Sequence, residues 1–146
     1  MSYLPNIEPV TLFLLVFGAV FGWKALFIAY VYVLAEILFY GIGRWNINYL
    51  YIWVIPTVAG HLLRRWQHPV IWAVVAGLYG LLFGALCAPV DLFIGGIGFA
   101  VSKWVSGIPF DLAHGAGNFV LALLLFVPLR KLTYRLATHS ALNFKR

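Results

Sequence analysis

Three polar side chains open an apolar segment of this chain: Asp111, His114 and Asn118 in "GIPFDLAHGAGNF", directly before "VLALLLF". An α-helix turns about 100° per residue, which places these positions within about 60° of one another on one face. A carboxylate, an imidazole and an amide are costly in lipid unless they face a cavity or the bundle interior. We therefore expect one wall of a polar pocket here, where Gly115 leaves room for a ligand or another backbone.

The same residues have structural interpretations. Pro109 suits the first turn of a helix, and Asp111 two residues later would complement the positive end of the helix dipole without any ligand. His114 and Asn118 could hydrogen-bond a neighbouring helix. The sequence favours the pocket for the three together, and for Asp111 alone both interpretations stay open.

Further polar and aromatic residues are predicted to lie at the same external end of the helix bundle. Their carboxylates and amides could fix the polar groups of a ligand, and their tryptophan rings could stack on a flat ring. For each residue singly, a solvated loop or the aromatic belt at the headgroup layer is the simpler interpretation. Together they predict a substrate-binding site formed by Asn6, Glu8, Trp53, Asp91, Trp104, Asp111, His114 and Asn118.

Glu36 lies within the apolar run "AYVYVLAEILFYG", where an ionised carboxylate costs at least about 2 kcal/mol. It must be paired, protonated or exposed to water. Pairing with a polar group on another helix is the favoured interpretation, and proton coupling is the alternative. His61, near the end of its own apolar run, is interpreted as an interfacial residue rather than a ligand.

Composition places these residues in a membrane. Hydrophobic residues make up 64% of the 146 residues and charged residues 10%, which leaves too little polar surface for a soluble domain. Runs near the length of a membrane crossing predict an all-α integral membrane protein, a single domain with a compact bundle of five transmembrane helices. The stretch "FIGGIGFAVSKW" predicts a short external surface helix before the last span. The predicted spans are residues 10–22, 25–42, 49–63, 70–88 and 110–129.

Basic residues orient these spans. The tail, residues 130–146, is rich in Lys and Arg, so the positive-inside rule places the C-terminus in the cytoplasm. Five spans also put Lys24, Arg64 and Arg65 inside, whereas a sixth span would move them outside. The expected location is the cell membrane, crossed several times, with a cytoplasmic basic tail.

Small residues recur every four positions along the predicted span 70–88. Such residues let helices approach closely in lipid, where no hydrophobic force drives their association. Internal packing is the default interpretation, and a docking face for a partner membrane subunit is the sharper alternative. The predicted partner-docking residues are Ala76, Gly80, Gly84 and Ala88.

Motifs for several other functions are missing. Cys87 is the single cysteine, and His and Cys are not spaced as metal ligands. The sequence contains no GxxxxGK[ST], HExxH or GxSxG motif. The net charge is +6, but the basic residues lie beside apolar runs and form no recognised nucleic-acid-binding pattern. A membrane enzyme using Asp111 and His114 as acid and base would lack a nucleophile beside them. We expect no enzyme activity, no cofactor, no metal and no nucleic acid, with the lipid bilayer as a partner.

Three segments together resemble the substrate-binding S components of energy-coupling factor (ECF) transporters: "LPNIEPVTLFLLVFG", "GLLFGALCAP" and "WVSGIPFDLAHGAGNFVLALLLFVPL". The resemblance extends over residues 4–132. It implies a subunit that captures a vitamin or similar micronutrient near the external face. It also implies two kinds of partner, a membrane coupling subunit and two ATPase subunits. The ATPase subunits would hydrolyse ATP, for which this sequence contains no motif.

Members of that family are usually bundles of six helices with both ends in the cytoplasm. The family's first helix has no matching segment here, so the expectation is a five-span member or a truncated start, and "LPNIEPV" corresponds to the lid loop after that helix. The predicted function is a binding and translocation subunit for a small, ring-containing nutrient. The alternative is a stand-alone proton-coupled secondary transporter or small channel using Glu36 and His114.

Overall fold

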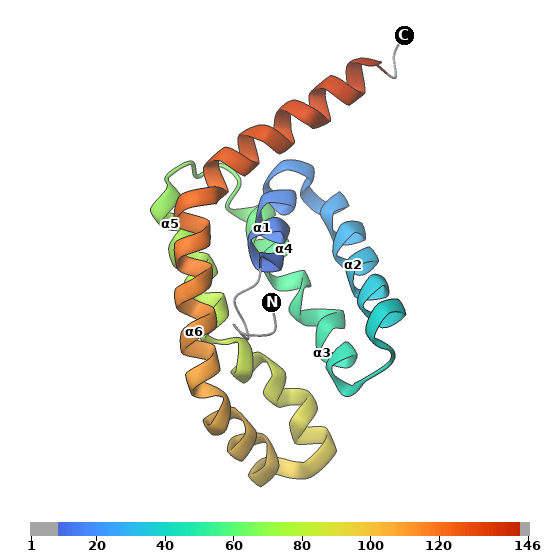
Figure 1. Ribbon diagram of the computed structural model, residues 1–146, viewed down its shortest axis with the longest axis vertical. Coiled ribbons are helices and arrows are strands. Elements are labelled where there is room, and N and C mark those ends of the chain that lie inside the picture. Colours follow the sequence, from blue (N-terminus) through green and yellow to red (C-terminus); the bar gives the residue numbers. More distant parts are fainter. Residues whose placement is uncertain (1–8, 144–146) are drawn as a thin grey trace.

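The computed structural model describes residues 9–143, with side chains for residues 9–139, and this part of the chain is all-helical. Figure 1 shows helices running back and forth between two ends, with the C-terminal part of the last helix projecting from one end. The predicted all-α class is confirmed. The elements are α1 (Val10–Phe21), the 3-10 turn η1 (Gly22–Lys24), α2 (Ala25–Tyr40), α3 (Arg44–Ile52), α4 (Val54–Leu62), α5 (Pro69–Leu81) and α6 (Phe83–Asn143).

Two helical stretches, Val10–Tyr40 and Pro69–His139, are long and apolar enough to cross a membrane by length and composition. The first stretch reverses direction at η1, where Gly22 adopts a φ of +62° that side chains with a Cβ rarely tolerate. The length and apolar composition of the two stretches agree with the predicted membrane association.

The longest helix, α6, contains a break at Gly96, where φ is +75° and ψ is −179°. The break divides α6 into a short arm before Gly96 and a long arm after it, and these arms form the hairpin in Figure 1. The predicted surface helix is therefore wrong as a separate element, because residues 97–109 are the first turns of the last helix. Pro109 lies inside that helix, where it costs one backbone hydrogen bond without ending the helix.

Two other predicted spans are divided. The run predicted at 49–63 consists of α3 and α4, which meet at Trp53, and the helix already begins at Arg44. Asn46 explains this early start, because its Oδ1 accepts a hydrogen bond of 2.6 Å from the backbone N–H of Gly43. The run predicted at 70–88 is likewise interrupted at Leu82, between α5 and α6.

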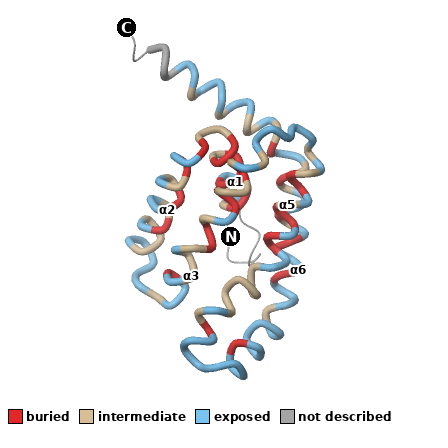
Figure 2. The backbone as a smooth tube through the Cα atoms, turned by 180° about the vertical axis from the view of Figure 1, so that it is seen from behind, coloured by how far each residue is buried: buried red, intermediate tan, exposed pale blue. Residues whose placement is uncertain are grey.

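The core lies where α1, α4, α5 and the long arm of α6 meet. Trp72 and Phe126 stack with ring centroids 3.9 Å apart and are fully buried. The α1 and α4 backbones approach so closely that a Cβ on Gly18 would overlap the carbonyl oxygen of Thr57. Figure 2 shows the buried residues along the facing sides of α1, α5 and α6, whereas the outer surfaces are exposed.

Basic residues gather at one end of the bundle, which we call the basic end. Trp23 of η1 contacts His61 of α4 there, with ring centroids 4.5 Å apart. Arg130 of α6 donates hydrogen bonds to the carbonyl oxygens of Trp66 and Arg64, at 3.0 and 2.5 Å. The opposite end, which we call the distal end, contains the α2–α3 loop and the bend of α6. The basic end contains Lys24, Arg64, Arg65, Arg130, Lys131 and Arg135.

Candidate functional site

A cavity of about 420 Å³ opens on the distal half of the bundle, between α2, α3 and the α5–α6 segment. This volume lies within the usual range of small-molecule sites. Aromatic rings form most of the wall, together with one carboxylate and one imidazole. The lining residues are Tyr32, Glu36, Tyr40, Trp45, Tyr49, Trp53, Phe83 and His114.

The wall is built by two ladders of side chains with four-residue spacing, one on α2 and one along α3. Residues four apart lie on the same face of a helix, and the loop 41–43 folds α3 back beside α2 so that the two faces meet. The sequence predicts Trp53 and His114 as site residues and Glu36 for the alternative function, but not the other rings. Their regular spacing is the signal that could have found them. The ladders are Tyr32, Glu36 and Tyr40 on α2, and Trp45 and Tyr49 on α3 with Trp53 directly after it.

Trp53 forms the floor of the cavity and is 3% exposed. Its ring contacts Tyr32 edge-on at 5.8 Å and Tyr49 at 5.2 Å between centroids, and it lies 6.0 Å from Phe83. Its indole Nε1 has no hydrogen-bond partner among the described residues. The floor therefore combines a large apolar surface with a buried donor, which usually requires a partner.

His114 supplies the imidazole on the α6 side of the cavity and is 3% exposed. The ring of Phe83 lies edge-on against it, with centroids 4.9 Å apart, and Tyr79 follows at 6.4 Å. The Tyr79 hydroxyl donates a hydrogen bond of 3.2 Å to the carbonyl oxygen of Ile52. These contacts hold the imidazole wall beside α3.

Glu36 lies on the middle rung of the α2 ladder and is half-buried. Its carboxylate forms no ion pair or hydrogen bond with any other residue that the structure describes. The pairing with another helix that the sequence favoured is therefore not found within this part of the chain. Glu36 instead presents a carboxylate to the cavity.

Asp111 is buried but does not line the cavity. The backbone N–H of Gly84, in the first turn of α6, donates to its two carboxylate oxygens at 3.0 and 3.2 Å. Of the two interpretations left open for Asp111, capping of its own helix is wrong, because Pro109 and Asp111 lie well inside α6. Asp111 stabilises a different helix start, the one that follows the break at Leu82.

Asn118 lies one helical turn beyond His114 and is 2% exposed. Neither its amide oxygen nor its amide nitrogen has a hydrogen-bond partner among the described residues. It is not among the residues that line the cavity. The predicted stripe of three polar residues is thus buried as expected, but within it His114 alone reaches the cavity wall.

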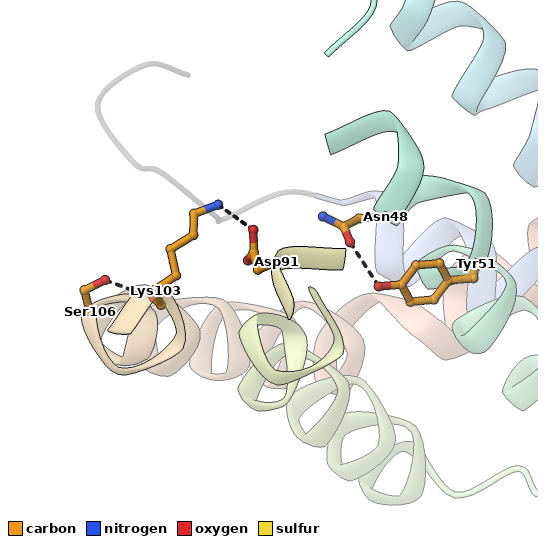
Figure 3. A network of polar contacts seen from close by, with 5 residues as sticks. All are labelled: Asn48, Tyr51, Asp91, Lys103 and Ser106. Atoms are coloured by element: carbon orange, nitrogen blue, oxygen red, sulfur yellow. Dashed lines mark hydrogen bonds and ion pairs between the residues drawn. The ribbon is translucent and has the colours of Figure 1, made fainter. Parts of the chain in front are cut away.

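The remaining predicted site residues lie elsewhere. Asp91 forms an ion pair with Lys103, at 3.1 Å between Oδ1 and Nζ, which joins the two arms of α6. Figure 3 shows this pair and, separately, the Tyr51 hydroxyl beside the Asn48 amide oxygen at 3.0 Å. Trp104 is 42% exposed and does not line the cavity. Asn6 and Glu8 lie outside the described residues.

The predicted docking ridge faces the inside of the chain. Ala76 is fully buried, and a Cβ on Gly80 would lie 2.7 Å from the backbone nitrogen of Gly115. The space beside Gly115 that we expected for a ligand is occupied by α5, since a Cβ there would meet Leu81 at 2.5 Å. Gly84 is covered by Asp111, and Ala88 is partly exposed. This placement favours the default interpretation, internal packing, for Ala76 and Gly80, and the docking role stays a prediction.

No family model, curated protein or solved structure matches the chain. The resemblance to the S components therefore stays a prediction. Among the residues that the structure describes, no three His, Cys, Asp or Glu side chains are grouped to hold a metal ion. The cavity has the features of a binding site, because its rings and two polar groups can bind and orient a small molecule.

Proposed function

We propose that the chain is a membrane-embedded binding subunit that captures a small, ring-containing nutrient, such as a vitamin, at its distal end. The observation that carries the proposal is the aromatic cavity of about 420 Å³ with Glu36 and His114 in its wall. Aromatic faces stack on flat rings and exclude water, and a few fixed polar groups set the orientation of a ligand. No step of this function requires the chain to change its ligand chemically.

The proposed topology has five crossings and places the cavity outside. The cationic groups at the basic end, among them Arg64 and Arg130, favour a cytoplasmic location for that end. The chain then crosses at α1, at α2, at α3 with α4, at α5 with the short arm of α6, and at the long arm. Large apolar side chains on the outer surface of α2, such as Phe27 and Phe39 at 75% and 84% exposure, suit contact with lipid.

In this proposal the energy for uptake comes from partner subunits. The sequence contains no phosphate-binding loop, and its resemblance to the S components favours a membrane coupling subunit and two ATPases as partners. With the ridge around Gly80 packed internally, such a coupling subunit would have to contact another surface of the chain.

Native mass spectrometry of the protein purified from its own host tests the binding function. We expect a small molecule to co-purify with the wild-type protein and to be lost from Trp53→Ala, which removes the cavity floor. Trp66→Ala is the matched control, because this tryptophan is 56% exposed at the basic end. Folded wild-type protein without any bound small molecule would contradict the proposal.

A second candidate function is a proton-coupled secondary transporter or small channel. The observation that favours it is the presence of Glu36 and His114, two groups that can exchange protons, in the wall of one cavity. Vesicles containing this chain alone distinguish the two functions. Uptake driven by a pH gradient would favour the transporter, whereas dependence on ATP and on co-expressed partners would favour the binding subunit.

A further inference from the structure

The cavity wall has a charge pattern opposite to that of the whole chain. The sequence contains 10 Lys and Arg against 4 Asp and Glu. The residues that line the cavity, among those the structure describes, include the carboxylate of Glu36 but neither Lys nor Arg. A carboxylate that has no partner among the described residues favours cations in the cavity and repels anions.

The basic residues nearest to the distal end are directed elsewhere. Arg44 lines a separate hollow that shares Trp45 with the cavity and also includes Ile37 and Ile42. Lys103 is engaged by Asp91 at 3.1 Å. Neither residue lines the cavity that contains Glu36.

The rings that line the cavity, which we call the aromatic box, are inclined to Trp53 rather than stacked flat on it. Tyr32 meets Trp53 at an interplanar angle of 83°, and Tyr49 and Phe83 meet it at 59° and 48°. Because these rings border one cavity at different angles, a ligand there meets aromatic surfaces in several orientations. The negative π-faces of Trp and Tyr attract ammonium groups, and aromatic cages of this kind recognise quaternary ammonium ligands.

We infer that the ligand of this cavity is a small organic cation, with a quaternary, protonated or ring-alkylated nitrogen held by the aromatic box and facing Glu36. This inference rests on the proposed binding function and specifies its substrate class. Trp53 supplies the floor for the cationic group, and the carboxylate of Glu36 compensates its charge. His114, on the opposite wall, is placed to contact the far end of the ligand.

Three water-soluble probes of nearly the same shape test the charge preference: choline, the neutral 3,3-dimethylbutan-1-ol and the anionic 3,3-dimethylbutanoate. Their dissociation constants are measured by isothermal titration calorimetry on the dialysed full chain in lipid nanodiscs. We expect choline to bind about tenfold more tightly than the alcohol, and the carboxylate to bind most weakly.

Glu36→Gln removes the charge while keeping the size of the side chain. We expect it to remove most of the preference for choline over the alcohol. Arg44→Gln changes a charge at the same end of the bundle but outside the cavity, and should leave the preference near that of the wild type. An unchanged preference in Glu36→Gln, with both variants folded, would overturn the role of this carboxylate.

The alcohol or 3,3-dimethylbutanoate could bind as tightly as choline and lose this binding in Trp53→Ala. That result would overturn the cation inference but leave the proposed binding function standing. Failure of all three probes to bind would also overturn the cation inference. The binding function is judged separately, by the small molecule that co-purifies with the wild-type protein, because that measurement uses none of these probes.

Discussion

The carboxylate of Asp111, on the long arm of α6, accepts a hydrogen bond from the backbone N–H of Gly84, with 3.0 Å between the nitrogen and Oδ1. This contact holds the first turn of α6 against its later turns. Gly84 has no room for a side chain, since a Cβ there would lie 2.5 Å from Asp111 Oδ2. The contact joins residues 27 positions apart. The hydrogen bond therefore fixes the short arm of α6, which contains Phe83, relative to the long arm, which contains His114.

Asp111→Ala is expected to lower the free energy of unfolding by about 1–3 kcal/mol, because the N–H of Gly84 loses its acceptor in a partly buried position. Asp111→Asn keeps an oxygen that can accept this hydrogen bond and should lose less. Thermal unfolding in detergent compares both variants with the wild type. Equal stability of Asp111→Ala and the wild type would contradict the proposed contact.

Gly80→Ala is expected to destabilise the protein by about 1–3 kcal/mol. Its Cβ would lie 2.7 Å from the backbone nitrogen and 2.8 Å from the Cα of Gly115, and backbone atoms cannot move aside as a flexible side chain can. Gly107→Ala is the matched control, because nothing lies within 4 Å of its Cβ position in the same long helix. The control should be neutral or stabilising by up to about 1 kcal/mol. Similar melting temperatures for the two variants would refute the close approach of α5 and α6.

Asn118→Leu is expected to raise the stability by about 1 kcal/mol, because it replaces a buried amide without a partner among the described residues by an apolar side chain of similar size. Asn118→Ala serves as the comparison, since it also removes the amide but leaves a space. Chemical or thermal unfolding in the same detergent ranks the three proteins. A loss of stability in Asn118→Leu as large as that in Asn118→Ala would mean that the amide is satisfied in the protein.

Arg130→Ala is expected to reduce the stability by about 1 kcal/mol, since the guanidinium loses its hydrogen bonds to the carbonyl oxygens of Trp66 and Arg64. Arg130→Lys should restore only part of the loss, because the single ammonium group of lysine cannot reach both carbonyl oxygens as the two nitrogens of the guanidinium do. Arg135→Ala removes a nearby cation and is the control for charge alone. A loss in Arg135→Ala equal to that in Arg130→Ala would argue against a specific role of the two hydrogen bonds.

The sequence predicts the local features of this fold well. The apolar runs beginning at Val10 and Ala25 match α1 and α2 to within two residues. The spacing of Asp111, His114 and Asn118 also predicted that they share a face, and all three are buried. Periodicity and hydropathy determine these features within one helix.

Relations between helices were not predictable in the same way. Capping of its own helix was one of two interpretations left open for Asp111, because Pro109 suits the first turn of a helix, yet the break at Gly96 lies 13 residues before Pro109 and the helix begins there. The role of Asp111 then depends on where the backbone of Gly84 lies, which only packing decides. The α2 and α3 ladders are regular in the sequence, but they form a cavity because the loop 41–43 sets them face to face.

The central claim is that the aromatic cavity, and not the polar stripe as a whole, binds the ligand. The most direct test compares ligand occupancy by native mass spectrometry in His114→Ala and Asp111→Asn, both purified from the protein's own host and verified as folded. Because His114 lines the cavity and Asp111 does not, we expect His114→Ala to lose most of the ligand and Asp111→Asn to retain it. Loss of the ligand from a folded Asp111→Asn variant, with retention in His114→Ala, would contradict the account.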